Sequence, residues 1–155
     1  MNMQNYIENL LSRRFLNYLD IYKNTLKVTQ YDYNKAFINN NWIGTNLCGP
    51  SIVVCYNILK NDYNLKNIKM NIYENIDYND DFTLDHTFMV INENIYVDPT
   101  YKQFLKNTKN YSNIFVSNKE NLKNIIKNNS FLEDFKLWNT SNNITVKIDK
   151  FNLKI

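Results

Sequence analysis

The stretch that decides the fold is residues 48–60, which read CGPSIVVCYNILK. Pro50 stands where the first turn of a helix tolerates proline, because the N–H that proline lacks would have no partner there. The apolar run behind it suits a buried helix of about three turns. Val and Ile also permit a strand, but the Cys-Gly-Pro start favours a helix that begins at Cys48.

A second helix is predicted ahead of this one, over residues 3–23. Its apolar residues recur at helical spacing, so one face should pack on the core. A helix lying on a membrane surface is the alternative, but Glu8, Asp20 and the scarcity of basic residues disfavour it. Residues 24–47, which contain two runs of turn-forming residues, are predicted to be irregular.

The pattern changes to short strands after the 48–60 helix. Residues 69–73 and 86–91 are predicted as strands, with a polar loop at 75–81 between them. A tight turn at 92–94 leads into a returning strand at 95–98, which makes a hairpin. Three further elements are predicted: a strand at 113–116, a short helix at 119–127 and a last strand at 144–148. The predicted fold is α+β, one domain over residues 1–155, with helices first and an antiparallel sheet after.

The composition is dominated by Asn, which makes up about a fifth of the 155 residues. The favoured residues have AT-rich codons, so we interpret the bias as genomic. A prion-like segment is the alternative, but apolar residues are interleaved throughout the chain. Gly and Pro occur twice each and His once. These scarce residues gather at one possible site: Gly44, Gly49 and Pro50 flank Cys48, Pro99 follows Asp98, and His86 is the single histidine.

These residues predict a thiol-based active site. The thiolate is the attacking form of cysteine, and both a helix N-terminus and an imidazolium favour it. Cys48 is therefore the predicted nucleophile and His86 the predicted base. His86 begins one strand of the hairpin and Asp98 ends the other, so Asp98 should orient the ring. Asp85 is the weaker candidate, because neighbouring strand residues face opposite sides of a sheet.

The groups beside Cys48 predict where a substrate carbonyl would bind. Gly49 lets a substrate approach the backbone without a Cβ in the way. The N–H groups of Cys48 and Gly49 can then help to bind a developing oxyanion. Among the side chains of the preceding loop, Asn46 is closest to the helix tip, with Asn40 and Asn41 as alternatives.

Each of these residues also has an ordinary structural interpretation. Cys48 can be a small buried hydrophobe, His86 a hydrogen-bonded core histidine, and Asp98 the start of a turn. Their order and their flanking residues together favour the catalytic interpretation. Cys55 is assigned to the core. The predicted helix disfavours a disulfide with Cys48, because seven residues of helix separate the two cysteines by about 10 Å.

Several other functions lack support in the sequence. One His, two Cys and no C-x-x-C motif leave too few zinc ligands, so no metal and no cofactor are expected. The sequence contains no nucleotide-binding loop motif. A net charge of +3 is too small to predict a basic surface that binds nucleic acid or membrane. Without a signal sequence or an apolar span, the expected setting is the cytoplasm, of its own cell or of a host cell, and the expected state is a monomer.

Two segments resemble a known superfamily. LCGPSIVVCYNIL (residues 47–59) resembles the nucleophile helix of papain-like cysteine enzymes, especially bacteriocin-processing-type peptidases. HTFMVINENIYVDPTYKQF (residues 86–104) resembles the His and Asp strands of transglutaminase-like proteins and papain-fold deamidase toxins. The resemblance covers about residues 40–105. It implies a papain-like core, in which a nucleophile helix packs on a small antiparallel sheet, and a Cys48–His86–Asp98 triad.

The resemblance implies a thiol-dependent amide hydrolase or acyl transferase that acts on a protein or peptide. The first step would form a thioester on Cys48, and the reaction would be peptide or isopeptide hydrolysis, glutamine deamidation or transamidation. Papain-type peptidases carry an oxyanion Gln about six residues before the Cys, where this chain has Trp42. A narrow cleft lined by Trp42 and Tyr101 would favour a side-chain amide or a Gly-containing tail. The alternative is a catalytically inactive papain-like fold that binds proteins.

Overall fold

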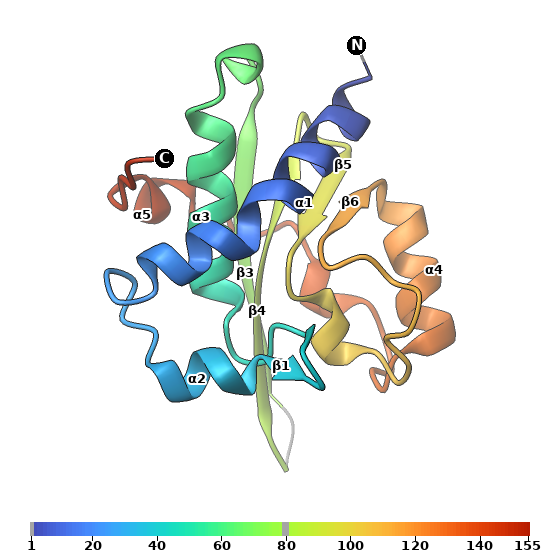
Figure 1. Cartoon of the computed structure of the whole chain (residues 1–155). Coiled ribbons are helices and arrows are strands. Elements are labelled where there is room, and N and C mark those ends of the chain that lie inside the picture. Colours follow the sequence, from blue (N-terminus) through green and yellow to red (C-terminus); the bar gives the residue numbers. More distant parts are fainter. Residues whose placement is uncertain (1, 79–80) are drawn as a thin grey trace.

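A four-stranded antiparallel sheet forms the centre of the computed structural model, which describes residues 2–78 and 81–155. Its strands follow the chain in the order β3 (Met70–Tyr78), β4 (Thr83–Ile91), β5 (Ile95–Asp98) and β6 (Phe115–Ser117). Helix α3 (Cys48–Lys60) packs on β4, and α1 (Met3–Tyr22) crosses α3 and β6 (Figure 1).

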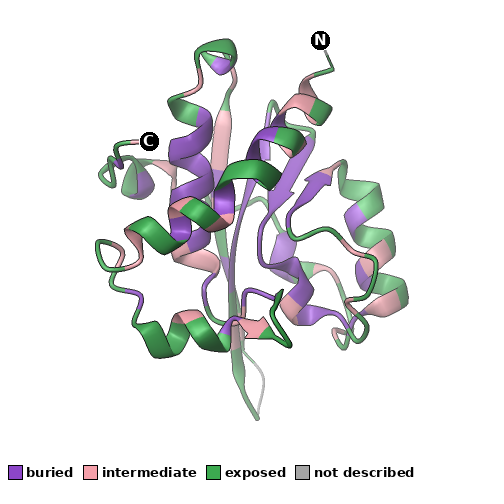
Figure 2. Cartoon of the chain, viewed as in Figure 1, coloured by how far each residue is buried: buried purple, intermediate pink, exposed green. Residues whose placement is uncertain are grey.

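Buried residues run from His86 to Ile91 of β4 and through all of β5 (Figure 2). Their side chains lie on both faces of the sheet. On the face that α1 and α3 cover, Met89 and Val97 join the larger hydrophobic cluster. On the other face, Phe88 and Tyr96 join a second cluster with residues from α4 (Lys119–Asn129) and the 3-10 turn η3 (Lys136–Trp138). The alternation of neighbouring strand residues between the two clusters is what a sheet buried on both faces requires.

Strand β5 is much shorter than β4, and this difference shapes the site. Their pairing begins at Ile91–Ile95 and ends at Met89–Val97. The first half of β4 therefore has β3 on one side but no β5 residue on the other. The 3-10 turn η2 (Tyr101–Phe104) follows β5 directly.

The α+β prediction is confirmed, as are the helices expected at 3–23, 48–60 and 119–127. The strands expected at 86–91 and 95–98 fall within β4 and β5, and those expected at 69–73 and 113–116 overlap the start of β3 and of β6. No helix in the described part of the chain has the length and apolar character needed to cross a membrane.

Residues 24–47, which were expected to be irregular, contain regular structure. Thr29 caps helix α2 (Gln30–Lys35) by accepting a hydrogen bond from the Asp32 N–H. Strands β1 (Phe37–Ile38) and β2 (Asn41–Trp42) then form a hairpin. The two Asn residues between them have positive φ, the conformation of the tight turns that suit hairpins. The Asn residues predict the turn, but strands of two residues are too short to show a strand pattern in the sequence.

The predicted loop at 75–81 is wrong up to Tyr78, because β3 continues to that residue along the first half of β4. Residues 79–80 lie outside the described residues. The polar composition was misleading because cross-strand partners decide strand formation more than intrinsic preference does. Asn75 shows the effect: its buried amide donates to the carbonyls of Leu137 and Asn139.

The strand predicted at 144–148 is also wrong, because this segment forms helix α5 (Thr145–Asp149). Its β-branched residues favour a strand, but one local and one long-range hydrogen bond at its first residue decide the outcome. The side chain of Asn143 accepts from the Thr145 N–H, and the Thr145 hydroxyl accepts from Ile72 of β3. Local side-chain bonds to the backbone compete with strand pairing and set helix starts. The remaining 3-10 turn, η1 (Tyr63–Leu65), follows α3.

Candidate active site

Cys48 is the first residue of α3 and is partly exposed. The chain reaches it through a tight turn in which Gly44 and Asn46 both have positive φ, and the Leu47 N–H donates to the Gly44 carbonyl. Within the described residues, no hydrogen bond engages the N–H of Cys48 or of Gly49. This is the expected state of the first N–H groups of a helix.

His86 and Asp98 meet across the sheet, in the region where β4 extends past β5. His86 Nε2 lies 2.6 Å from Asp98 Oδ2, and both side chains are almost fully excluded from solvent. If the β4–β5 register continued, Phe88 would be opposite Asp98, so His86 lies diagonally across from the carboxylate. The diagonal position is within reach for long side chains. By contrast, Asp85 pairs with Ile76 and is exposed.

Asp98 accepts hydrogen bonds from three groups. Besides His86, Trp138 Nε1 donates to Oδ2 at 2.6 Å and the Thr100 N–H donates to Oδ1 at 3.1 Å. A buried carboxylate with several donors is held in one orientation. Sequence reasoning missed Trp138, which η3 brings from forty residues away. Its only sequence signal is that it is one of two Trp residues, set in a polar tail.

The His86 ring is held in its charged form by its neighbours. Burial lowers the pKa of His86, but the charge and hydrogen bond of Asp98, with a contribution from Cys48, raise it from 6.5 to about 10. Cys48 is thus close enough to act on the ring, although no hydrogen bond of normal geometry joins them. His86 Nδ1 is buried without a hydrogen-bond partner in the described chain. Because Asp98 occupies Nε2, Nδ1 is the nitrogen left to act on Cys48.

Aromatic rings enclose the imidazole. Phe104 and Trp138 contact it edge-on, with ring centroids 5.0 and 5.2 Å away, and Phe88 stacks at 6.1 Å. An imidazolium is attracted to the faces of such rings, and the rings keep water from the pair with Asp98. The low dielectric strengthens this pair. Of the three members of the candidate triad, Cys48 alone is partly exposed.

Trp42 is buried, which corrects the expectation that its side chain lines a substrate cleft. Its side chain is only 1% exposed, and its Nε1 donates to the Pro99 carbonyl at 2.7 Å. Tyr101 is buried as well and donates to the Ser112 carbonyl. Trp42 therefore cannot line an open cleft. Tyr101 does line a surface pocket, together with Tyr111 and Phe115, but the lining of that pocket includes neither Trp42 nor Cys48. The Trp42 contact instead ties the end of β2 to the turn that follows Asp98.

The two glycines play different parts. Gly44 has φ +85°, and a Cβ at this position would lie 2.6 Å from Thr100 Cγ2. The loop before Cys48 therefore lies directly against the turn after Asp98. A Cβ on Gly49 would meet no other segment of the described chain within 4 Å. Gly49 thus leaves open space beside Cys48, where a substrate could approach. Asn46 lies on the surface of the loop.

Cys55 is enclosed two turns further along α3 and is fully buried. Burial, with a smaller effect from the charge of Asp98, raises the pKa of the Cys55 thiol far above its ordinary value. The two cysteines are both free thiols, but they differ in accessibility and environment. Chemistry on a thiol is therefore confined to Cys48.

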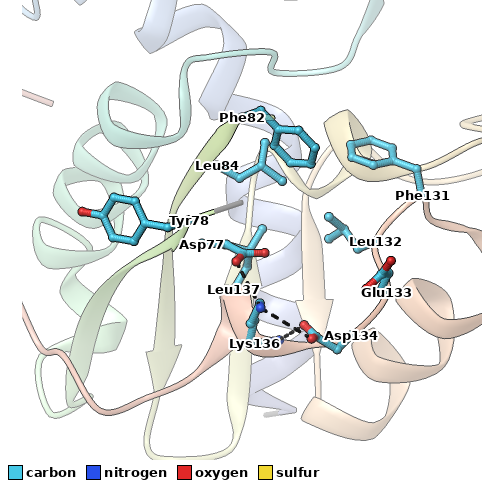
Figure 3. Close-up of a pocket in the computed structure, with 10 residues that line it drawn as sticks. All are labelled: Asp77, Tyr78, Phe82, Leu84, Phe131, Leu132, Glu133, Asp134, Lys136 and Leu137. Carbon is cyan, nitrogen blue, oxygen red and sulfur yellow. Dashed lines mark hydrogen bonds and ion pairs between the residues drawn. The ribbon is translucent and has the colours of Figure 1, made fainter. Parts of the chain in front are cut away.

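A groove of about 560 Å³ lies on the opposite side of β4 from α3, between this strand and the segment 131–137 (Figure 3). Phe82 and Leu84 form one wall, and Phe131 faces them. Lys136 pairs with Asp77 and Asp134 at its edge. Its lining does not include Cys48. Among the described residues, no group of three His, Cys, Asp or Glu side chains is arranged to hold a metal ion.

Comparisons of this chain with protein-family models, with curated proteins and with solved structures give no match.

Proposed function

We propose that this protein is a papain-like thiol enzyme that cleaves or exchanges amide bonds through a thioester on Cys48. The observation that carries the proposal is the buried His86–Asp98 pair, which leaves His86 Nδ1 without a partner on the side of Cys48. A charged imidazole beside a thiol at a helix N-terminus favours the nucleophilic thiolate. The partly exposed thiol of Cys48 would make the attack, and the buried His86 would transfer the proton.

The chemistry would proceed in two halves. The Cys48 sulfur forms a bond to the amide carbon, and the carbonyl π pair moves onto oxygen. That pair returns as the C–N bond breaks, and the leaving amine or ammonia takes the proton from His86 Nδ1. Water, or a second amine, then gives a proton to His86 and attacks the thioester, which releases the product and the thiolate. Asp98 keeps the ring oriented during both transfers.

We extend the proposal to the setting in which the protein would work. The substrate would be the amide of a protein or peptide, and the protein would act as a monomer in a cytoplasm, its own or that of a host cell. Hydrolysis, deamidation and transamidation share the first half of the reaction. A helix that carries the thiol and packs on an antiparallel sheet is the arrangement that a papain-like core requires, and it supports the proposed superfamily.

A binding protein that has kept this fold without catalysis is the second candidate. The full burial of His86 favours it, because a structural histidine would look the same. Hydrogen-bonded buried ion pairs also occur for structural reasons alone. The two candidates differ in one property, which is the reactivity of Cys48.

Alkylation with iodoacetamide tests the proposal. For the folded protein we expect fast labelling of Cys48 below pH 7, with the adduct located by mass spectrometry. His86→Ala should abolish this fast phase, because the thiolate then loses its cationic partner. Cys55 serves as the internal control and should stay unlabelled until the protein unfolds. Slow labelling of Cys48 at the rate of a free thiol, unchanged by His86→Ala, would leave the binding protein as the better interpretation.

A further inference from the structure

The buried side-chain polar atoms that lack a hydrogen bond gather around one place in the described structure. They are Ser51 Oγ, His86 Nδ1, Thr100 Oγ1 and Gln103 Nε2. Ser51 is one helical turn from Cys48, and Thr100 packs against Gly44. Most buried polar groups find partners, so a cluster of unpaired ones needs a functional or structural reason. His86 Nδ1 already has a reason in the proposed reaction.

Gln103 is the member of this cluster whose side chain accepts a hydrogen bond from the loop before Cys48. Its Oε1 accepts a long hydrogen bond, at 3.5 Å, from the N–H of Asn46, two residues before Cys48. With the oxygen of the amide on that side, Nε2 is a donor without an acceptor. Gln103 is also partly exposed, whereas Ser51 and Thr100 are fully buried. Its amide is therefore the one that lies between the buried site and solvent.

An oxyanion accepts hydrogen bonds and cannot donate them, so a donor-only group suits it better than a hydroxyl. The nitrogen of a side-chain amide is such a group. The unpaired N–H groups of Cys48 and Gly49 are donors from the same region, at the positive end of α3. The open space at Gly49 gives a carbonyl a way to reach them.

We propose that Gln103 supplies the side-chain donor to the carbonyl oxygen that becomes negative when Cys48 attacks. This inference rests on the proposed thioester chemistry and adds a residue to it. The donor comes from η2, after the orienting acid, and not from the loop before the nucleophile, where Trp42 is buried. The contact with the Asn46 N–H holds the amide in position before the substrate arrives, as such donors require.

Two probes of Cys48 separate this role from thiol reactivity. In acylation by p-nitrophenyl acetate, sulfur bonds to the carbonyl carbon and the π pair moves onto oxygen. The pair returns as the C–O bond breaks and p-nitrophenolate leaves. In alkylation by iodoacetamide, sulfur displaces iodide and no oxyanion forms. Gln103→Met, similar in size and without the donor, should slow acylation about 100- to 1000-fold and leave alkylation unchanged. Gln103→Ala should give the same separation.

The controls give each outcome one meaning. Gln30→Ala, on the exposed helix α2, should change neither rate, and far-UV circular dichroism should show that the Gln103 variants are folded. The inference is overturned if Gln103→Met is acylated as fast as the parent protein, or if its acylation and alkylation rates fall equally. It is also overturned if Asn46→Gly lowers the acylation rate and the Gln103 variants do not. If the parent Cys48 alkylates and acylates no faster than in the unfolded chain, the proposed function itself fails.

Discussion

His86 Nε2 lies 2.6 Å from Asp98 Oδ2, and Trp138 Nε1 donates to the same oxygen at an equal distance. With the Thr100 N–H on Oδ1, both oxygens of this carboxylate accept hydrogen bonds. The carboxylate is therefore the centre of a buried network that joins β4, β5 and η3. Loss of this carboxylate should lower both the free energy of unfolding and the reactivity of Cys48.

Asp98→Asn should lower the free energy of unfolding by about 3–5 kcal/mol, the usual cost of breaking a buried pair. An asparagine cannot satisfy this site, because its NH₂ group must face a donor on whichever side it points. Urea denaturation at pH 7 measures the change. Asp85→Asn, at the exposed neighbour of His86, is the control and should change stability by less than about 0.5 kcal/mol. Equal effects of the two substitutions would contradict the network.

The stability should fall as the pH rises from about 6.5 to about 10. The pKa of His86 is raised to about 10 in the folded protein, whereas an unfolded histidine titrates near 6.5. Between these values the folded state binds a proton that the unfolded chain has lost, so the contribution of His86 is complete below pH 6.5 and is lost through pH 10.

Denaturation midpoints across this range test the sign. Cys48→Ser is the background, so that the thiol does not titrate, and the variant that also carries His86→Gln is the comparison. The slope against pH should be steeper where His86 is present, by an amount that integrates to on the order of a few kcal/mol. Parallel slopes would mean that the histidine is not held charged.

Alanine in place of Gly44 should lower the stability of the fold, whereas alanine in place of Gly49 should slow the reaction of Cys48. Gly44→Ala forces a side chain into positive φ and against Thr100, so it should destabilise the fold by about 1–3 kcal/mol or more. Gly49→Ala adds a methyl group to open space at the start of a helix, so stability should be unchanged or slightly higher. Its effect should appear instead as slower acylation of Cys48. Thermal melts and p-nitrophenolate release measure the two properties, and a destabilised Gly49→Ala would contradict this division.

The two tryptophans form a matched pair. Each is 1% exposed and donates one hydrogen bond through Nε1. The acceptor of Trp138 is a charged carboxylate, whereas that of Trp42 is the Pro99 carbonyl. Trp138→Phe should therefore lose about 1.5–3 kcal/mol from this bond and Trp42→Phe about 0.5–1.5 kcal/mol. Trp138→Phe should also shift the pH profile of Cys48 alkylation, because Trp138 positions Asp98. A larger loss in Trp42→Phe would reverse this ranking.

The central parts of the fold could be predicted from the sequence because their signals are local. The Cys48-Gly49-Pro50 start and the apolar run after it are sufficient for α3, and the turn at 92–94 places His86 near Asp98. These elements also contain the candidate triad. The strand extension to Tyr78 depends on pairing with the first residues of β4, and the position of helix α5 depends in part on a hydrogen bond with Ile72, far along the chain. The preferences of the single residues reveal neither.

The supporting residues of the site were harder to foresee for the same reason. Trp138 reaches Asp98 from η3, and Gln103 reaches the loop before Cys48 from η2. Each contact requires knowing how β5 ends and what then packs beside it. Gln is nevertheless scarce in this Asn-rich chain, with three in 155 residues. That scarcity is the same kind of signal that pointed to Gly44 and His86.

The close approach of Gly44 to Thr100 restricts how a protein of this kind can diverge. It joins the segment leading into Cys48 to the segment that follows Asp98, so an added residue in either would move these two residues apart. Insertions should therefore be tolerated elsewhere, in connections remote from the start of α3. The lengths of the two segments that meet at Gly44 and Thr100 should be fixed, whereas the peripheral loops are free to vary in length.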